Sequence, residues 1–179
     1  MSWVYIPGTP GTAGTPDQIV EADSVGWTSG SVSIPITNGN GGYEFTVPAD
    51  VVGAVCGLAN NYAGTGYRSI NHALYFTRGQ VVYMEYGTQV ASLGAYLSSD
   101  KFVMVQLGST MILKRNGVVE LQRFSTLGQV FRLASSLYLS GDTIVDAKVI
   151  GVAAGASTGS ADTTFGPMTF ASTMVSPLR

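Results

Sequence analysis

Residues 111–123, MILKRNGVVELQR, place the dipeptide Asn116-Gly117 between two runs of strand-forming residues. In a two-residue hairpin turn of type I′ both central residues need a positive φ, and Asn-Gly accepts this conformation readily. The stretch therefore predicts an antiparallel β-hairpin with Asn116 and Gly117 at its tip. This hairpin indicates an all-β fold class, because similar strand and turn signals recur on both sides of residues 111–123.

Outside this hairpin, apolar side chains alternate with polar or smaller ones in short runs. Residues 70–77 and 101–107 show the alternation most clearly, as expected for strands with one buried face. Further strands are predicted near residues 31–37, 43–47, 51–59, 80–86, 90–96, 131–139 and 143–152. No segment carries a helical stripe of apolar residues. About ten short strands at near-even spacing predict an all-β fold: a sandwich, a jelly roll or a barrel.

The predicted sandwich domain, residues 20–152, is flanked by two segments of different composition. Residues 1–19 hold three prolines and three glycines and predict an extended N-terminal arm. Residues 153–179 begin with small residues and predict a flexible C-terminal docking segment. An extended arm can bury large apolar side chains only on the domain or on another subunit. The predicted assembly contacts are Trp3, Tyr5 and Ile6 in the first arm, and Phe165, Met168 and Phe170 in the second.

The low charge content excludes several classes of partner. Charged residues make up 11% of the chain, against a usual share of roughly a quarter. The nine basic residues are scattered and the formal net charge is −2, so no stripe exists to neutralise phosphates, and neither nucleic acid nor an anionic membrane is an expected partner. No run approaches the roughly 18 apolar residues of a membrane helix, and the first residues lack the features of a signal peptide. We expect synthesis in the cytoplasm.

The sequence offers little material for catalysis. Glycoside hydrolysis needs two carboxyl groups roughly 5 to 10 Å apart, and Glu85 is the best single candidate, without a second acid placed beside it. With one cysteine and one histidine, no metal cluster or catalytic triad is apparent. Cys56 is predicted to be a small buried apolar residue, and His72 a partly buried histidine with a satisfied hydrogen bond. The sequence predicts a protein without enzymatic activity, catalytic residue, metal or cofactor.

The aromatic residues leave two interpretations open. Tyrosine and tryptophan fill sandwich cores and subunit interfaces, and they also stack on sugar rings. The residues concerned are Trp27, Tyr62, Tyr67, Tyr75, Tyr83, Tyr86, Tyr96 and Tyr138. Residues 60–67, NNYAGTGY, form a long uncharged loop that is rich in amides. We therefore predict glycan contact at Asn60, Asn61, Tyr62 and Tyr67.

The order of motifs in residues 24–150 resembles the concanavalin A-like sandwich modules of phage tail and cell-surface adhesion proteins. The stretches that carry the resemblance are GLA (57–59), INHALYF (70–76), VYMEYG (82–87), YLSSDKF (96–102), LKRNG (113–117) and SLYLSGDTI (136–144). Two departures are Ser99, where a glycine usually precedes Asp100, and Leu113-Lys114-Arg115, where an aromatic residue usually precedes Asn116-Gly117. The calcium and sugar ligands of legume lectins have no match here, so the resemblance does not carry lectin activity over.

The resemblance implies an antiparallel jelly-roll sandwich of the lectin and glucanase type. The opening, MSWVYIPG, and residues 23–27, DSVGW, resemble small structural proteins encoded among the late genes of siphophages. A non-enzymatic virion protein is therefore expected, in a tail tip, baseplate or fibre. Its expected partners are other phage structural proteins and further copies of itself. A receptor-recognition module that binds host surface glycan is the alternative.

Overall fold

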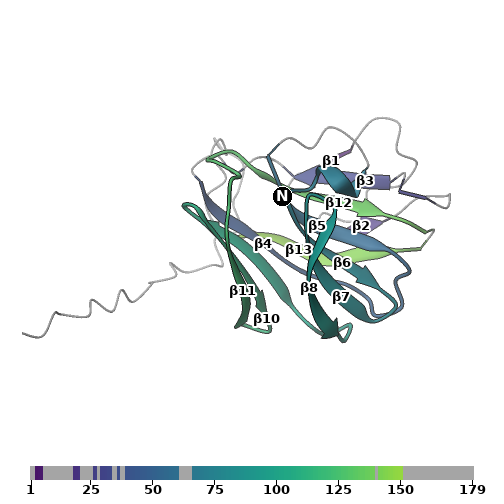
Figure 1. The fold of residues 1–179 in the computed structure, drawn as a ribbon. Helices are drawn as coiled ribbons and strands as arrows, with labels where there is room; N and C mark the ends of the chain where they lie inside the picture. The colour runs from purple at the N-terminus through teal and green to yellow at the C-terminus, as the bar shows by residue number, and fades with distance from the viewer. Residues whose placement is uncertain are drawn as a thin grey trace, which may run out of the picture.

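The computed structural model describes residues 3–5, 18–20, 26–27, 29–33, 36, 39–60, 66–139 and 141–150. Within them, the chain forms two antiparallel sheets stacked face to face, as Figure 1 shows. The seven-stranded sheet has the order β1 (Trp3–Tyr5), β3 (Ser29–Ser33), β12 (Arg132–Leu137), β5 (Ala54–Ala59), β6 (His72–Thr77), β7 (Gln80–Glu85) and β8 (Thr88–Ala95). The six-stranded sheet has the order β11 (Val118–Phe124), β10 (Thr110–Arg115), β9 (Phe102–Leu107), β4 (Asn40–Thr46), β13 (Thr143–Ile150) and β2 (Gln18–Val20). One short 3-10 helix, η1 (Tyr67–Ser69), interrupts the strands. The predicted all-β sandwich is confirmed.

The Asn116-Gly117 hairpin is confirmed by its backbone. Arg115 pairs with Val118, and Asn116 and Gly117 have φ angles of 51° and 83°. The Asn116 side chain also joins the tip to the loop before β9: its amide nitrogen donates to Asp100 over 2.8 Å, and its oxygen accepts from the Lys101 N–H over 2.9 Å. The dipeptide therefore supplies both the turn geometry and two long-range contacts.

The core between the sheets is rich in aromatic rings. Phe76 of β6 meets Phe102 of β9 edge to face with 5.0 Å between ring centroids, and Tyr96 lies 5.1 Å from Phe76 in the same way. Phe102 and Met104 point into this core, so the alternate residues Val103 and Val105 point outward. This alternation is what the period-two pattern predicted.

Several predicted strands differ from those observed in their bounds, and the contacts explain two of the differences. The strand expected at 51–59 begins only at Ala54, because the N–H groups of Val52 and Gly53 bond to the Asp142 carboxylate and not to a neighbouring strand. The strand expected at 31–37 is β3, which ends at Ser33, followed by an isolated bridge between Ile36 and Phe131.

Parts of the predicted N-terminal arm pair with the two sheets. β1 pairs with β3, and β2 pairs with β13. The side chains of Trp3 and Tyr5, together with Ile6, Phe165, Met168 and Phe170, lie outside the described residues. The predicted arm and domain boundaries, and the assembly contacts, stay predictions.

The single cysteine and the single histidine of the chain both lie in the interior. Cys56 has no exposed surface, as predicted, and its burial raises the pKa of its thiol far above the ordinary value. His72 is 3% exposed, and its Nδ1 lies 2.6 Å from the Tyr83 hydroxyl, but its Nε2 has no hydrogen-bond partner among the described residues. The predicted hydrogen bond is present at Nδ1, but the side chain is buried and not partly buried as expected. The ring is fully inside, where the adjoining apolar core offers Nε2 no donor.

Candidate functional site

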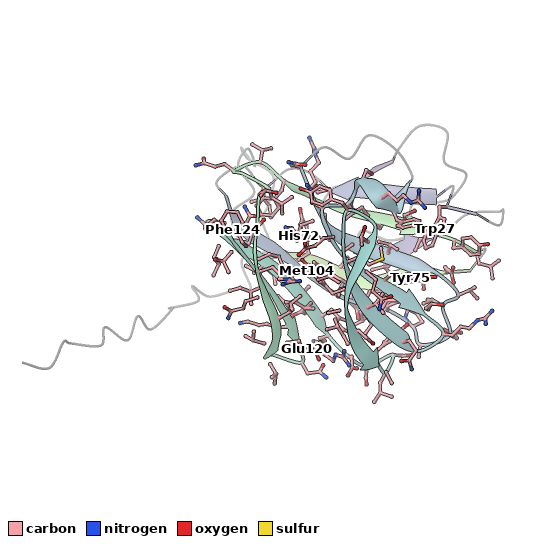
Figure 2. The ribbon with its side chains drawn as sticks, viewed as in Figure 1. Trp27, His72, Tyr75, Met104, Glu120 and Phe124 are labelled. Carbon is pink, nitrogen blue, oxygen red and sulfur yellow. The ribbon has the colours of Figure 1, made fainter. Side chains whose placement is uncertain are left out.

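A pocket of about 280 Å³ opens at the outer side of the seven-stranded sheet. It is lined by Trp27, Val52, Tyr75, Thr77, Arg78 and Tyr138. Figure 2 shows Trp27 and Tyr75 near one another on the right of the view. The lining residues come from four separate parts of the chain, so only the folded sheet brings them together.

Three aromatic rings lie against Trp27. Its ring centroid lies 4.7 Å from that of Tyr67, 5.3 Å from that of Tyr138 and 5.7 Å from that of Tyr75. All four side chains are half-buried, so each keeps part of its ring surface in solvent. Beneath them lies a second apolar cluster on the outer face of this sheet, which includes Ala73 and Met84. The result is a supported aromatic surface that remains accessible.

Backbone hydrogen bonds position Trp27 next to Tyr138. The N–H of Tyr138 donates to the Gly53 carbonyl over 2.8 Å, and the N–H of Gly26 donates to the Tyr138 carbonyl over 2.7 Å. Gly53 leaves room for both rings. A Cβ atom there would lie 2.7 Å from Cβ of Tyr138 and 3.3 Å from Cη2 of Trp27. The pocket therefore depends on a glycine at position 53.

The Asp142 carboxylate fixes the loops that carry Val52 and Tyr138. Its Oδ1 accepts from the Val52 N–H over 2.7 Å, and its Oδ2 accepts from the N–H groups of Gly53 and Leu139 over 3.0 and 2.8 Å. The side chain is 3% exposed. Buried N–H groups need acceptors, and charged acceptors bind them most strongly. Asp142 thus connects the start of β5 to the end of β12 beneath the pocket.

Polar groups line the other side of the pocket. The Thr77 hydroxyl donates to the Val52 carbonyl over 2.9 Å, and the Arg78 N–H donates to the Val51 carbonyl over 2.7 Å. Arg78 is the only charged residue of the lining, its side chain is exposed, and none of the ion pairs among the described residues involves it. It occupies the first turn position between β6 and β7 with φ of 47°, where glycine or asparagine is more usual. Within the described part of the chain, the pocket therefore carries an exposed guanidinium without an ion-pair partner beside its aromatic rings.

The predicted glycan loop contributes to this site in part. Tyr67, in η1, packs on Trp27, whereas Asn60 is half-buried and donates its backbone N–H to the Asn71 side chain over 3.2 Å. Asn61 and Tyr62 lie outside the described residues. Sequence reasoning noted Trp27, Tyr75 and Tyr138 as aromatic but did not select them, because nothing local to any of them indicates that they meet.

Other aromatic residues belong to the interior, as the alternative interpretation held. Tyr83 is fully buried and donates its hydroxyl to Glu85 over 3.0 Å, while Glu85 pairs with Arg123 over 3.4 Å. The Tyr83 hydroxyl therefore accepts from His72, which is neutral with its proton on Nδ1. Burial, more than the neighbouring charges, lowers the pKa of His72 and raises that of Tyr83. Among the described residues no second carboxylate joins Glu85 in this cluster.

The described residues contain no group of three or more histidine, cysteine or acidic side chains that could hold a metal ion. In the same part of the chain, no helix is long and apolar enough to span a membrane.

Comparison with known proteins gives structural matches alone. The sequence matches no protein-family model and no curated protein. The SPRY domain of human HERC1 matches with a TM-score of 0.56 at 12% identity, over 78% of this chain and 91% of that domain. A Bacillus subtilis protein of unknown function with a galectin-like fold matches with a TM-score of 0.55 at 11% identity, over 83% of this chain and 88% of that one. The alginate lyase AlgAT5 of polysaccharide lyase family 7 matches with a TM-score of 0.53 at 11% identity, over 74% of each chain.

At these identities the matches show the fold. The chain has the galectin-like and concanavalin-like sandwich that the motif order led us to expect. The same architecture occurs in a polysaccharide lyase and in a SPRY domain, so the function must be argued from the pocket.

Proposed function

We propose that this protein is a carbohydrate-binding module without enzymatic activity, and that it holds a sugar at the Trp27 pocket. The observation that carries the proposal is the half-buried aromatic cluster around Trp27, next to Arg78 and Thr77. The apolar face of a sugar ring stacks on indole or phenol rings, while its hydroxyl groups bond to polar groups at the rim. Aromatic rings that served the core alone would not keep accessible surface around an open pocket.

The absence of enzymatic activity is supported by how the strand carboxylates are used. Glu44 pairs with Lys101 over 3.9 Å, Glu85 pairs with Arg123, and Glu120 pairs with Arg115 over 2.9 Å. None of these carboxylates lines the pocket. Among the described residues, the pocket therefore lacks the two facing carboxyl groups that glycoside hydrolysis requires. Release of reducing ends from a polysaccharide by the purified protein would refute this part of the proposal.

The test of glycan binding is an array of polysaccharides and oligosaccharides probed with three proteins. These are the wild type, Trp27→Ala and the matched control Phe124→Ala, which removes an exposed ring from the opposite sheet. We expect wild type and control to bind the same glycans and Trp27→Ala to lose them while keeping its β-sheet circular dichroism. Equal binding by all three proteins would place the sugar elsewhere, and no binding by wild type would reject the function.

At a finer level, we propose that the module belongs to the tail of a tailed bacteriophage of the siphophage type. It would be made in the host cytoplasm and assembled into the tail tip, baseplate or fibre with other phage structural proteins and further copies of itself. The motif order of residues 24–150 and the opening residues support this assignment. In such a particle the Trp27 pocket would face outward and contact host surface glycan. Mass spectrometry of purified virions, together with antibody labelling of their tails, tests the assignment.

A further inference from the structure

The outer face of the six-stranded sheet carries an apolar surface on the far side of the sandwich from the Trp27 pocket. Figure 2 shows Phe124 and Trp27 at opposite sides of the view. Residues 102, 104, 111 and 113 point into the core, so the alternate side chains of β9 and β10 point outward. We call these residues and their β11 neighbours the outer apolar face: Val103, Val105, Leu107, Ile112, Val119 and Phe124.

This surface spans three strands, with polar residues between its β9 and β11 members. Val105 pairs with Ile112 between β9 and β10, and Thr110 pairs with both Leu107 and Phe124 at one end. Directly paired side chains on one face are in contact range. Leu107 is 37% exposed, Val119 46% and Phe124 75%, so three of the eight exposed large apolar residues in the described part of the chain lie here.

Two charged groups lie on this face. Glu44 of β4, next to Val103 at the edge of the outer apolar face, pairs with Lys101, and Lys114 of the central strand β10 lies between Val103 and Val119. A contiguous apolar surface with a polar rim marks a contact site in a soluble protein, whereas isolated apolar residues do not. The remaining question is what occupies it.

The course of the chain indicates the occupant. β13 ends at Ile150, which pairs with Gly42 of β4, and Gly42 pairs with Val105. Ile150, Gly42, Val105 and Ile112 thus form one row across the sheet. With neighbouring strands about 4.8 Å apart, Ile150 lies roughly 10 Å from Val105 and roughly 15 Å from Ile112. The last described strand therefore ends in the same row of the sheet as Val105 and Ile112 of the outer apolar face.

The sequence after Ile150 matches this position. Residues 151–164 are almost all small, and Phe165, Met168, Phe170 and Met174 follow. Fourteen residues can span up to about 46 Å, which is ample to reach any part of the outer apolar face. A tethered segment also meets its site at a high effective concentration without needing a second molecule.

We propose that the outer apolar face binds residues 165–174 of the same chain, with Phe165, Met168 and Phe170 as its apolar anchors. The face then serves to hold the C-terminal segment on the domain, and a neighbouring molecule that competes for the segment would free it. The proposal is independent of glycan binding, because it concerns the opposite sheet.

Photochemical cross-linking of the full chain tests the proposal. Ile112 is replaced by photoreactive benzoylphenylalanine, and in a control protein Leu97, 67% exposed and outside the outer apolar face, is replaced instead. After irradiation, mass spectrometry should find a cross-link from position 112 into residues 165–174 within species of monomer mass. Cross-links between two chains, cross-links to another segment, or a yield no greater than that of the control would each overturn the proposal.

Hydrogen exchange supplies a second test that needs no photochemistry. We expect the amides of residues 165–174 to exchange more slowly in the wild-type full chain than in a free peptide of the same sequence. The substitution Ile112→Arg should abolish that protection, while Leu97→Arg should leave it intact. Because Ile112 is on the outer surface, the variant should keep its fold, which circular dichroism verifies. Wild-type exchange at the rate of the free peptide would contradict the proposal.

Discussion

Replacing Asp142 by asparagine should destabilise the sandwich and disturb the Trp27 pocket together. The carboxylate accepts one N–H group at Oδ1, from Val52, and two at Oδ2, from Gly53 and Leu139. An asparagine has a single side-chain oxygen. In the more favourable orientation, the asparagine keeps this oxygen toward the N–H groups of Gly53 and Leu139. Its NH₂ group then faces the Val52 N–H, whose nitrogen lies 2.7 Å from Oδ1 of Asp142 in the wild type.

The expected magnitude follows from that geometry. One hydrogen bond to a charged acceptor is lost, which is worth about 1.5–3 kcal/mol. The Val52 N–H also faces a donor, so the loop must move or admit water. We therefore expect the free energy of unfolding to fall by about 2–4 kcal/mol, a large effect for a single isosteric substitution.

The measurement is urea denaturation followed by circular dichroism, with Asp146→Asn as the control. Asp146 lies in β13, the strand that follows Asp142, is exposed and has φ of 54°, which asparagine also accepts, so the charge change is the same without the buried contacts. The control should unfold at nearly the wild-type midpoint. An unchanged midpoint for Asp142→Asn would show that the carboxylate does not hold the two loops together.

Three further predictions concern the turn, the buried histidine and the pocket. Gly117→Val should cost about 1–2 kcal/mol in denaturation experiments, through backbone strain alone, since no atom lies within 4 Å of the added Cβ; an unchanged midpoint would contradict the positive φ at this position. Because burial lowers the pKa of His72, only the unfolded chain takes up this proton as the pH falls below about 6.5, and stability should decline from there until the lowered pKa is reached. His72→Gln should reduce this decline, and the same pH dependence in both proteins would count against His72 as its source. Arg78→Gln should weaken the binding of acidic glycans and leave the binding of neutral glycans unchanged in calorimetric titrations. An equal loss of affinity for both kinds of glycan would mean that the Arg78 guanidinium forms no ion pair with the ligand.

The fold could be predicted from the sequence because its signals are local. Asn116-Gly117 specifies its own turn, and Arg78-Gly79 repeats the geometry between β6 and β7 with φ angles of 47° and 75°. Each turn joins strands that are neighbours in both sequence and space. Alternation then decides which residues enter the core, as in β9. These features need no knowledge of distant parts of the chain.

The candidate site could not be predicted in the same way, because distant segments build it. Trp27 reaches Tyr138 only through the ladder that joins the Gly26, Tyr138 and Gly53 backbones. In the sequence, Asp142 looks like an ordinary acidic residue of a turn. Only the fold, which places it next to the start of β5, brings three backbone N–H donors to its carboxylate. Loop composition did point to residues 60–67, and of the loop residues that the structure describes, Tyr67 contacts Trp27. Long-range strand pairing thus determined what local patterns could not.

The central claim is that a sugar binds against Trp27, and the fluorescence of that residue tests it most directly. The chain has two tryptophans, so Trp3→Phe leaves Trp27 as the only one. Titration of this variant with a glycan that the protein retains should change the intensity and wavelength of the Trp27 emission. The change should saturate at the dissociation constant measured by calorimetry, and Tyr75→Ala should weaken both. Calorimetric binding that leaves the Trp27 emission unchanged would contradict the claim.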